Sequence, residues 1–166
     1  SVDNDERTNG RSDYSLGGKV KFFDQTKLLP DFAVIAAVTV PKGHPQFRSN
    51  GYDPEIKFCV AKDAPLGFAL SSNFNFASVK DGSGRFLART MTLSAGHAVW
   101  RDLSMYAETY NVTIDRGLGT STIVNAGLTH PIGKGAQVDI LTGHSVAGRQ
   151  VGWFVGVGLS IRQPLS

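Results

Sequence analysis

Large apolar residues alternate with small or polar residues along most of the chain, a pattern that predicts β-strands with one buried face. In the stretch 66–76, LGFALSSNFNF, nearly every second residue is large and apolar, and the residues between are glycine, alanine, serine and asparagine. The stretch 151–162 repeats this arrangement, with an apolar column that runs from Trp153 to Ile161. Each such strand therefore has one apolar face, which is buried against either a protein core or lipid.

Nine strands are predicted, at 16–23, 31–40, 53–61, 66–79, 85–97, 101–113, 120–130, 136–144 and 151–162. Several exceed the usual globular strand of about 5–6 residues and match the roughly 9–11 residues that a tilted strand needs to cross a bilayer. The connections alternate between two kinds, glycine-rich and charged (41–52, 80–84, 114–119, 145–150) and mostly compact (24–30, 62–65, 98–100, 131–135). Consecutive hairpins with turns at alternating ends predict an antiparallel up-and-down meander.

The whole chain, 1–166, is predicted to be a single domain, because no low-complexity linker interrupts the pattern. Residues 1–14 are polar and are interpreted as a loop or the remainder of a leader region, residues 15–162 carry the strands, and residues 163–166 form a tail. No run of about 18 apolar residues occurs, so no transmembrane helix is expected.

The composition of the polar face indicates whether the apolar face is buried against a protein core or against lipid. It is rich in glycine, alanine, serine and asparagine and carries isolated charges of both signs, whereas a soluble barrel typically presents long polar side chains outward. This composition favours a transmembrane β-barrel with a narrow polar interior and an apolar outer band. A soluble ligand-binding barrel is the alternative, since it shares the alternation. The residues predicted to line the interior are Lys19, Lys57, Tyr106, Glu108, Tyr110, Asp139 and Arg162.

Aromatic residues near the predicted strand ends fit the girdles that mark the two interfaces of a membrane barrel. In a soluble protein the same residues would belong to the core. They are Phe22, Phe23, Phe86, Trp100 and Trp153.

Charge and cysteine content exclude several classes of function. The 166 residues carry a net charge of only +3, with lysine and arginine scattered along the chain, so nucleic-acid binding is not expected. The single cysteine, Cys59, rules out an internal disulfide and a cysteine-rich zinc site. The four histidines show no ligand spacing, and neither a metal nor another cofactor is predicted.

One motif invites an enzymatic interpretation. The segment 143–148, GHSVAG, is similar to a hydrolase nucleophile elbow, but it has one residue too many before the second glycine and lies at a predicted strand end leading into a loop. A barrel esterase or lipid deacylase would need a serine within reach of His97, His130 or His144, with an acid to orient that histidine. No catalytic residue is predicted, and the protein is expected not to be an enzyme.

The order of landmarks resembles bacterial outer-membrane proteins of the "MetA-pathway of phenol degradation" family. A strand with a lysine leads into an apolar strand that ends in Pro-x-Gly, within SLGGKVKFFDQTKLLPDFAVIAAVTVPKG. The further matches are YDPEIKFCVAKDAPLGFALSSNFNF, WRDLSMYAETYN, NAGLTHPIGKGAQVDILTGH and GWFVGVGLSIR, so the resemblance covers about residues 15–162. It implies a β-barrel in the bacterial outer membrane, in contact with the lipid bilayer, that takes up small hydrophobic or aromatic compounds.

The chain departs from this pattern in its strand number. Bacterial single-chain barrels have an even number of strands, whereas nine are predicted here. This chain is therefore interpreted as the C-terminal part of a larger barrel, or as one that a partner chain or oligomer completes. A purely structural subunit of a larger membrane assembly is the alternative function.

Overall fold

The computed structural model describes residues 10–115, 119–148 and 152–161. They form one antiparallel sheet of nine strands in the order β1 to β9, in which each strand pairs with its neighbours in the sequence. The strands are β1 (Tyr14–Phe23), β2 (Asp31–Val40), β3 (Asp53–Asp63), β4 (Phe68–Asp81), β5 (Gly84–Trp100), β6 (Leu103–Ile114), β7 (Thr120–Ile132), β8 (Ala136–Ala147) and β9 (Trp153–Ile161). This confirms the predicted all-β meander.

The only helical element of the described residues is a single 3-10 turn, Pro65–Gly67, between β3 and β4. None of the described residues forms a helix long and apolar enough to cross a membrane.

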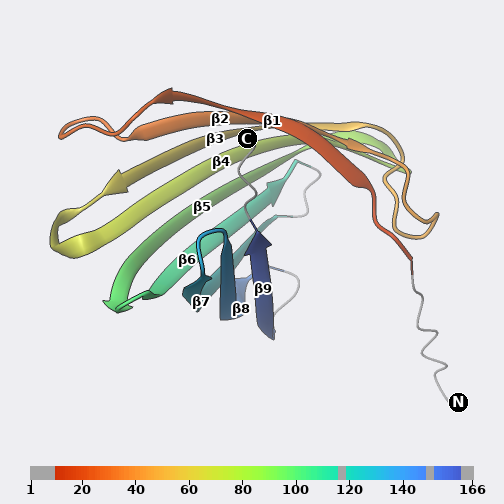
Figure 1. The fold of residues 1–166 in the computed structure, drawn as a ribbon. Helices are drawn as coiled ribbons and strands as arrows, with labels where there is room; N and C mark the ends of the chain where they lie inside the picture. Colours follow the sequence, from red (N-terminus) through yellow and green to blue (C-terminus); the bar gives the residue numbers. More distant parts are fainter. Residues whose placement is uncertain (1–9, 116–118, 149–151, 162–166) are drawn as a thin grey trace, which may run out of the picture.

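The sheet is strongly curved, and none of the described segments forms a second layer on it (Figure 1). Among the described residues β1 pairs only with β2, and β9 pairs only with β8, so the sheet is not closed. Because neighbours are antiparallel throughout, the first and the ninth strand run in the same direction. A direct pairing of these two edges would be parallel.

The two faces of the sheet differ in exposure as the alternation predicts. On β9 the apolar residues are largely exposed, with Val155 and Val157 at 74% and 76% exposure. The opposite, concave face is more crowded, and its residues on the central strands are mostly half-buried. Ala33 is the one described residue with an apolar side chain that is buried, so the described part of the chain has no conventional hydrophobic core.

Several strands run further than predicted. The predicted connection 98–100 belongs to β5, which continues to Trp100 before a two-residue turn at Arg101 and Asp102. Likewise β8 continues to Ala147, so the GHSVAG segment lies largely inside a strand. Backbone pairing with the neighbouring strand extends these elements beyond the point where the alternation weakens.

The sheet's longest described loop, 41–52, is fastened to the segment before β1 by one carboxylate. Asp13 accepts hydrogen bonds from the backbone N–H of Ser49 (2.6 Å) and of Gly43 (2.8 Å). These two bonds to the charged form lower the pKa of Asp13, the bond from Ser49 most strongly. A second carboxylate, Asp53, accepts a bond from the backbone N–H of Lys80 (2.7 Å) at the same end of the sheet.

Candidate functional site

The concave face of the sheet carries the residues that the sequence predicts as an interior lining. The strand register places the described members of the set on this face: Lys19, Lys57, Tyr106, Glu108, Tyr110 and Asp139. Arg162, the seventh, lies outside the described residues. Whether these residues contact a solute stays a prediction.

The basic and acidic members of this set lie on different parts of the face. Lys19 and Lys57 both lie opposite Ile35, on the strands that flank β2. Glu108 lies on β6, three strands beyond β3, which is about 14 Å along the sheet at a strand spacing of roughly 4.8 Å. The ion pairs of the described residues join other side chains, at Lys21–Asp24, Lys21–Asp31, Arg85–Asp53 and Arg89–Asp115.

Amide and hydroxyl side chains fill the middle of the concave face. The Asn73 amide donates to the Thr92 hydroxyl at 3.0 Å, and Asn75 donates to Glu55 at 3.3 Å. On β7, Asn125 donates to the carboxylate of Glu108 at 3.3 Å. These cross-strand bonds place an amide donor beside each of the two carboxylates, Glu55 and Glu108.

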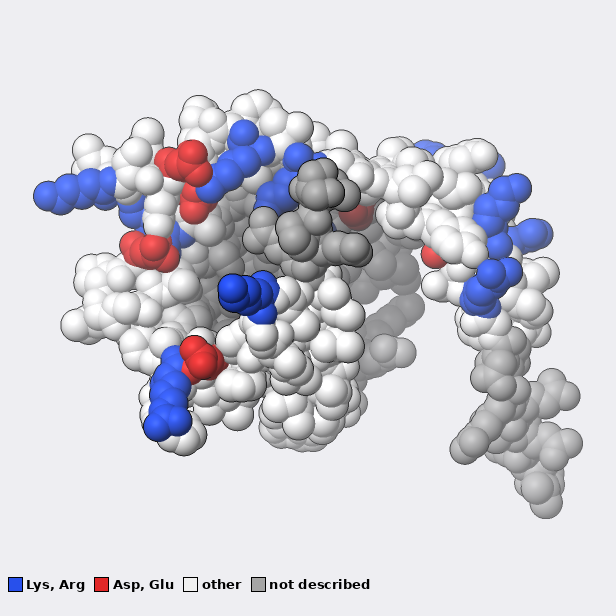
Figure 2. Space-filling view, in the orientation of Figure 1, with Lys and Arg blue, Asp and Glu red and all other residues white. Residues whose placement is uncertain are grey.

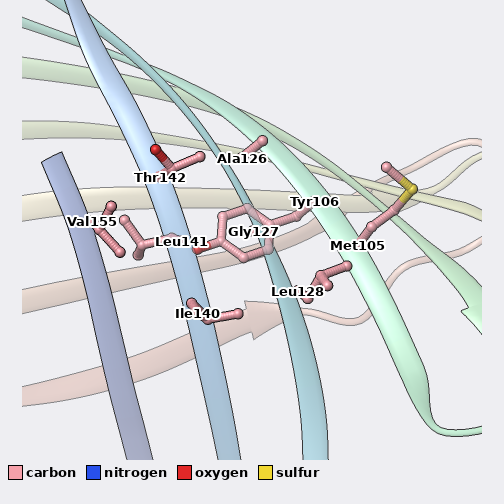
Figure 3. Close-up of a pocket in the computed structure, with 9 residues that line it drawn as sticks. All are labelled: Met105, Tyr106, Ala126, Gly127, Leu128, Ile140, Leu141, Thr142 and Val155. Atoms are coloured by element: carbon pink, nitrogen blue, oxygen red, sulfur yellow. The ribbon is translucent and has the colours of Figure 1, made fainter. Parts of the chain in front are cut away.

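Large side chains from the neighbouring strands lie over glycines on this face. The ring of Tyr106 extends across β7 at Gly127 toward Leu141 (Figure 3), and a Cβ added to Gly127 would meet the ring carbon Cε1 at 2.7 Å. The ring of Phe154 covers Gly143 in the same way. Glycine is therefore required at these positions by the close approach of a neighbouring ring, and the two rings are held flat against the sheet.

A small hollow of about 170 Å³ lies on the concave side of β1 to β3. Its floor is formed by small residues, Ala33, Cys59 and Ala61, and lysines 19 and 21 lie at its edge. The ammonium group of Lys21 is paired with Asp24 and Asp31, each at 2.6 Å. Lys21 and Asp31 were not recognised from the sequence, because only the pairing of β1 with β2 brings them together.

The largest hollow that we describe, about 360 Å³, lies on the opposite, convex side of β6 to β9 (Figure 3). Tyr106, Gly127 and Leu141 of the concave set also line it. Most of its side chains belong to the convex face, and the apolar ones among these include Met105, Leu128, Ile140 and Val155. These residues alternate with the concave set along each strand, so this hollow is a depression in the apolar outer surface. Figure 2 shows charged side chains at the left and right of the view and in its upper middle and centre, with uncharged areas between them.

The candidate catalytic residues are not arranged as a catalytic pair. His144 packs its ring on Trp153, with the ring centres 4.7 Å apart, whereas Ser145 points to the other face and is 8% exposed. Neighbouring residues in a strand point to opposite faces, so this serine and histidine cannot approach each other. His97 stacks on Phe68 at 4.7 Å, and its Nδ1 lies 3.1 Å from the carbonyl oxygen of Gly67.

No three histidine, cysteine, aspartate or glutamate side chains of the described segments come close enough to hold a metal ion. Cys59 is a free thiol.

An antiparallel meander with a bare apolar convex face and a polar, charged concave face defines the class of the protein, an all-β sheet of the up-and-down type. A family model described as "Putative MetA-pathway of phenol degradation" matches residues 1–163, and the chain belongs to this family. No curated protein gives a significant match. No solved structure gives one either.

Proposed function

We propose that this protein is a β-barrel protein of the bacterial outer membrane that passes or binds small hydrophobic or aromatic compounds. The family description, which refers to phenol degradation, supports the aromatic substrate class. The observation that carries the membrane assignment is the exposure of the convex face. On β9 alone, five large apolar residues are at least 64% exposed: Trp153, Val155, Val157, Leu159 and Ile161.

Such a face is unfavourable in water. Burying an aliphatic side chain of this size is worth roughly 1.5–3 kcal/mol relative to leaving it exposed. Curling the sheet into a closed barrel would not cover these residues, because they lie on its outer side. Lipid would solvate them, and the same argument makes a soluble ligand-binding barrel the weaker alternative.

The open edges of the sheet require partners in this setting. Unpaired backbone groups cannot be left in the hydrocarbon region. Because β1 and β9 run in the same direction, an antiparallel closure needs an odd number of further strands, supplied by the same polypeptide or by a partner. The second candidate function is that of a structural subunit of a larger assembly. The observation that favours it is that the outer edges of β1 and β9 have no pairing strand among the described residues.

We propose further that the protein is not an enzyme. His144 and Ser145, the one histidine and serine that are adjacent in the sequence, point to opposite faces of β8. Hydrolysis of a short acyl ester that is lost on His144→Ala would contradict this proposal.

The experiment that tests the membrane function combines fractionation with transport. Expressed in a bacterium with an outer membrane, the full chain should fractionate with that membrane and require detergent for extraction. In vesicles it should speed the entry of a neutral aromatic compound such as benzyl alcohol. A protein that is monodisperse in buffer without detergent would refute the membrane assignment, and membrane insertion without entry would favour the structural subunit.

A further inference from the structure

The strand register sorts the charged side chains of the sheet by face and by sign. On the convex face the charged residues of the described strands are all basic: Lys62, Lys80, Arg85 and Arg89. The concave face carries three lysines and seven acidic residues: Lys19, Lys21, Lys57, Asp31, Asp53, Glu55, Asp63, Asp81, Glu108 and Asp139. Carboxylates therefore outnumber lysines on the concave side of these strands, which favours the entry of cations over anions.

Two of the carboxylates have no cationic partner on their own part of the face. Within the described segments, Glu108 and Asp139 are the only charged residues that the register places on the concave side of β6 to β9. Neither of them forms an ion pair with a described residue. Glu108 is half-buried and receives one hydrogen bond, from the amide of Asn125. An ionised side chain inside a membrane barrel is costly to leave uncompensated, so this part of the face favours a bound cation.

Two aromatic rings lie beside Glu108 on the same face. The ring of Tyr106 extends across β7 at Gly127 (Figure 3). The ring of Phe154 lies over Gly143 on β8. These two glycines are diagonal neighbours on paired strands, about 7–8 Å apart. Glu108 is a diagonal neighbour of Gly127 on the other side, at the same spacing. The two rings and the carboxylate thus occupy adjacent positions, within reach of one small molecule.

Ring faces and a carboxylate both attract a cation. A cation within about 6 Å of the centre of an aromatic ring is attracted by the negative potential of the ring face. Because the rings of Tyr106 and Phe154 lie flat against the sheet, it is their faces that are turned to the concave side. Tyr106 also lies within electrostatic range of both Glu108 and Asp139. An anion at the same place is repelled by these groups.

We propose that the concave face of β6 to β9 binds aromatic cations, compounds with one aromatic ring and one ammonium group. The ammonium group is bound by the Glu108 carboxylate and the adjoining ring face of Tyr106, and the ring of the ligand lies against Phe154. This deepens the proposed transport function and rests on it, since it assigns the charge class of the solute and the residues that select it.

The test compares three compounds of similar size, namely benzyltrimethylammonium, benzenesulfonate and neutral benzyl alcohol, in vesicles that contain the full chain. The two ions keep their charge at any working pH, and vesicles without protein give the rate of entry through lipid. Benzyltrimethylammonium should enter faster than benzenesulfonate. Equilibrium dialysis of the protein in detergent should show the same order of binding.

The variant Glu108→Gln removes the charge and keeps the size of the side chain. It should weaken the binding of benzyltrimethylammonium about fivefold, the effect of one solvent-screened ion pair, and leave benzyl alcohol unaffected. Phe154→Leu, which removes the ring face but stays apolar, should weaken binding of the cation about two- to fivefold. Each variant is compared at equal amounts of folded protein, judged from the mobility of unheated samples in detergent gels.

Glu55→Gln is the matched control. Glu55 lies on the same concave face, and its carboxylate also receives an amide bond at 3.3 Å, from Asn75. It is on β3, three strands away from β6 and its neighbouring rings. Glu55→Gln should therefore bind benzyltrimethylammonium nearly as the unmodified protein does.

The outcomes separate the two proposals. Entry of all three compounds at equal rates, or faster entry of benzenesulfonate, would leave the transport function standing and overturn the cation preference. A preference for the cation that persists in Glu108→Gln, or falls equally in Glu55→Gln, would overturn the assignment to this site. Failure of all three compounds, benzyl alcohol included, to enter or bind would overturn the proposed function itself.

Discussion

An arginine on the convex face should damage membrane assembly far more than an arginine at the next residue. Leu93 and Ser94 are consecutive in the middle of β5 and point to opposite faces. Leu93 is 51% exposed on the convex side, beside Ser72 and Thr109. Ser94 lies on the concave side, directly opposite Glu108 on β6. The pair therefore compares the two faces at one depth in the sheet.

In Leu93→Arg the guanidinium group has to enter the lipid-facing surface. The penalty for arginine near the midplane of a barrel is roughly 2–4 kcal/mol, which corresponds to roughly a 30- to 700-fold change in the folding equilibrium at 1.4 kcal/mol per factor of ten. In Ser94→Arg the same group gains a partner in Glu108, an interaction worth up to about 1 kcal/mol. Its extra volume opposes that gain, so we expect a net effect near zero.

The assay is refolding into lipid vesicles, followed by urea titration and by the mobility of unheated samples in detergent gels. Leu93→Arg should lower the urea midpoint or abolish the folded band, and Ser94→Arg should retain both. Leu93→Ala controls for the lost side chain. Equal damage from the two arginines would refute the assignment of the faces, and greater damage at Ser94 would reverse it.

Three further predictions test other parts of the structure. Gly127→Ala should destabilise the fold by about 1–3 kcal/mol, as overpacked sites do, because the new methyl group meets Tyr106 and the Ile140 carbonyl oxygen. Gly18→Ala is the control: Gly18 has open space around it, so this substitution should leave the midpoint of the same urea titration unchanged. The pKa of Asp13 in the folded protein lies below its usual value of 3.8, so the ionised carboxylate should stabilise the 41–52 loop fully above pH 3.8 and lose this effect as the pH falls through the lowered pKa. Hydrogen exchange at the backbone amides of Gly43 and Ser49 should show this loss, and Asp13→Asn should remove the pH dependence. In Trp100→Phe, the remaining Trp153, 77% exposed, should be quenched by brominated lipid and poorly by acrylamide; the reverse pattern would argue against lipid contact.

The sequence by itself determined the all-β class, the number of strands and the face of most side chains. These are local properties, because the period of two along a strand decides which residues share a face without reference to any partner. It could therefore place Lys57, Glu108 and Asp139 together on one polar face, and it could separate that face from the apolar column of β9.

Only the tertiary structure decided what depends on register and curvature. The pairing of β1 with β2 brings Lys21 to Asp31, and the pairing of β6 with β7 lays Tyr106 over Gly127. The strand order also places Lys57, on β3, three strands away from Glu108, on β6. A contact between strands depends on how far each is shifted along its neighbour, and alternation within a single strand carries no record of that shift.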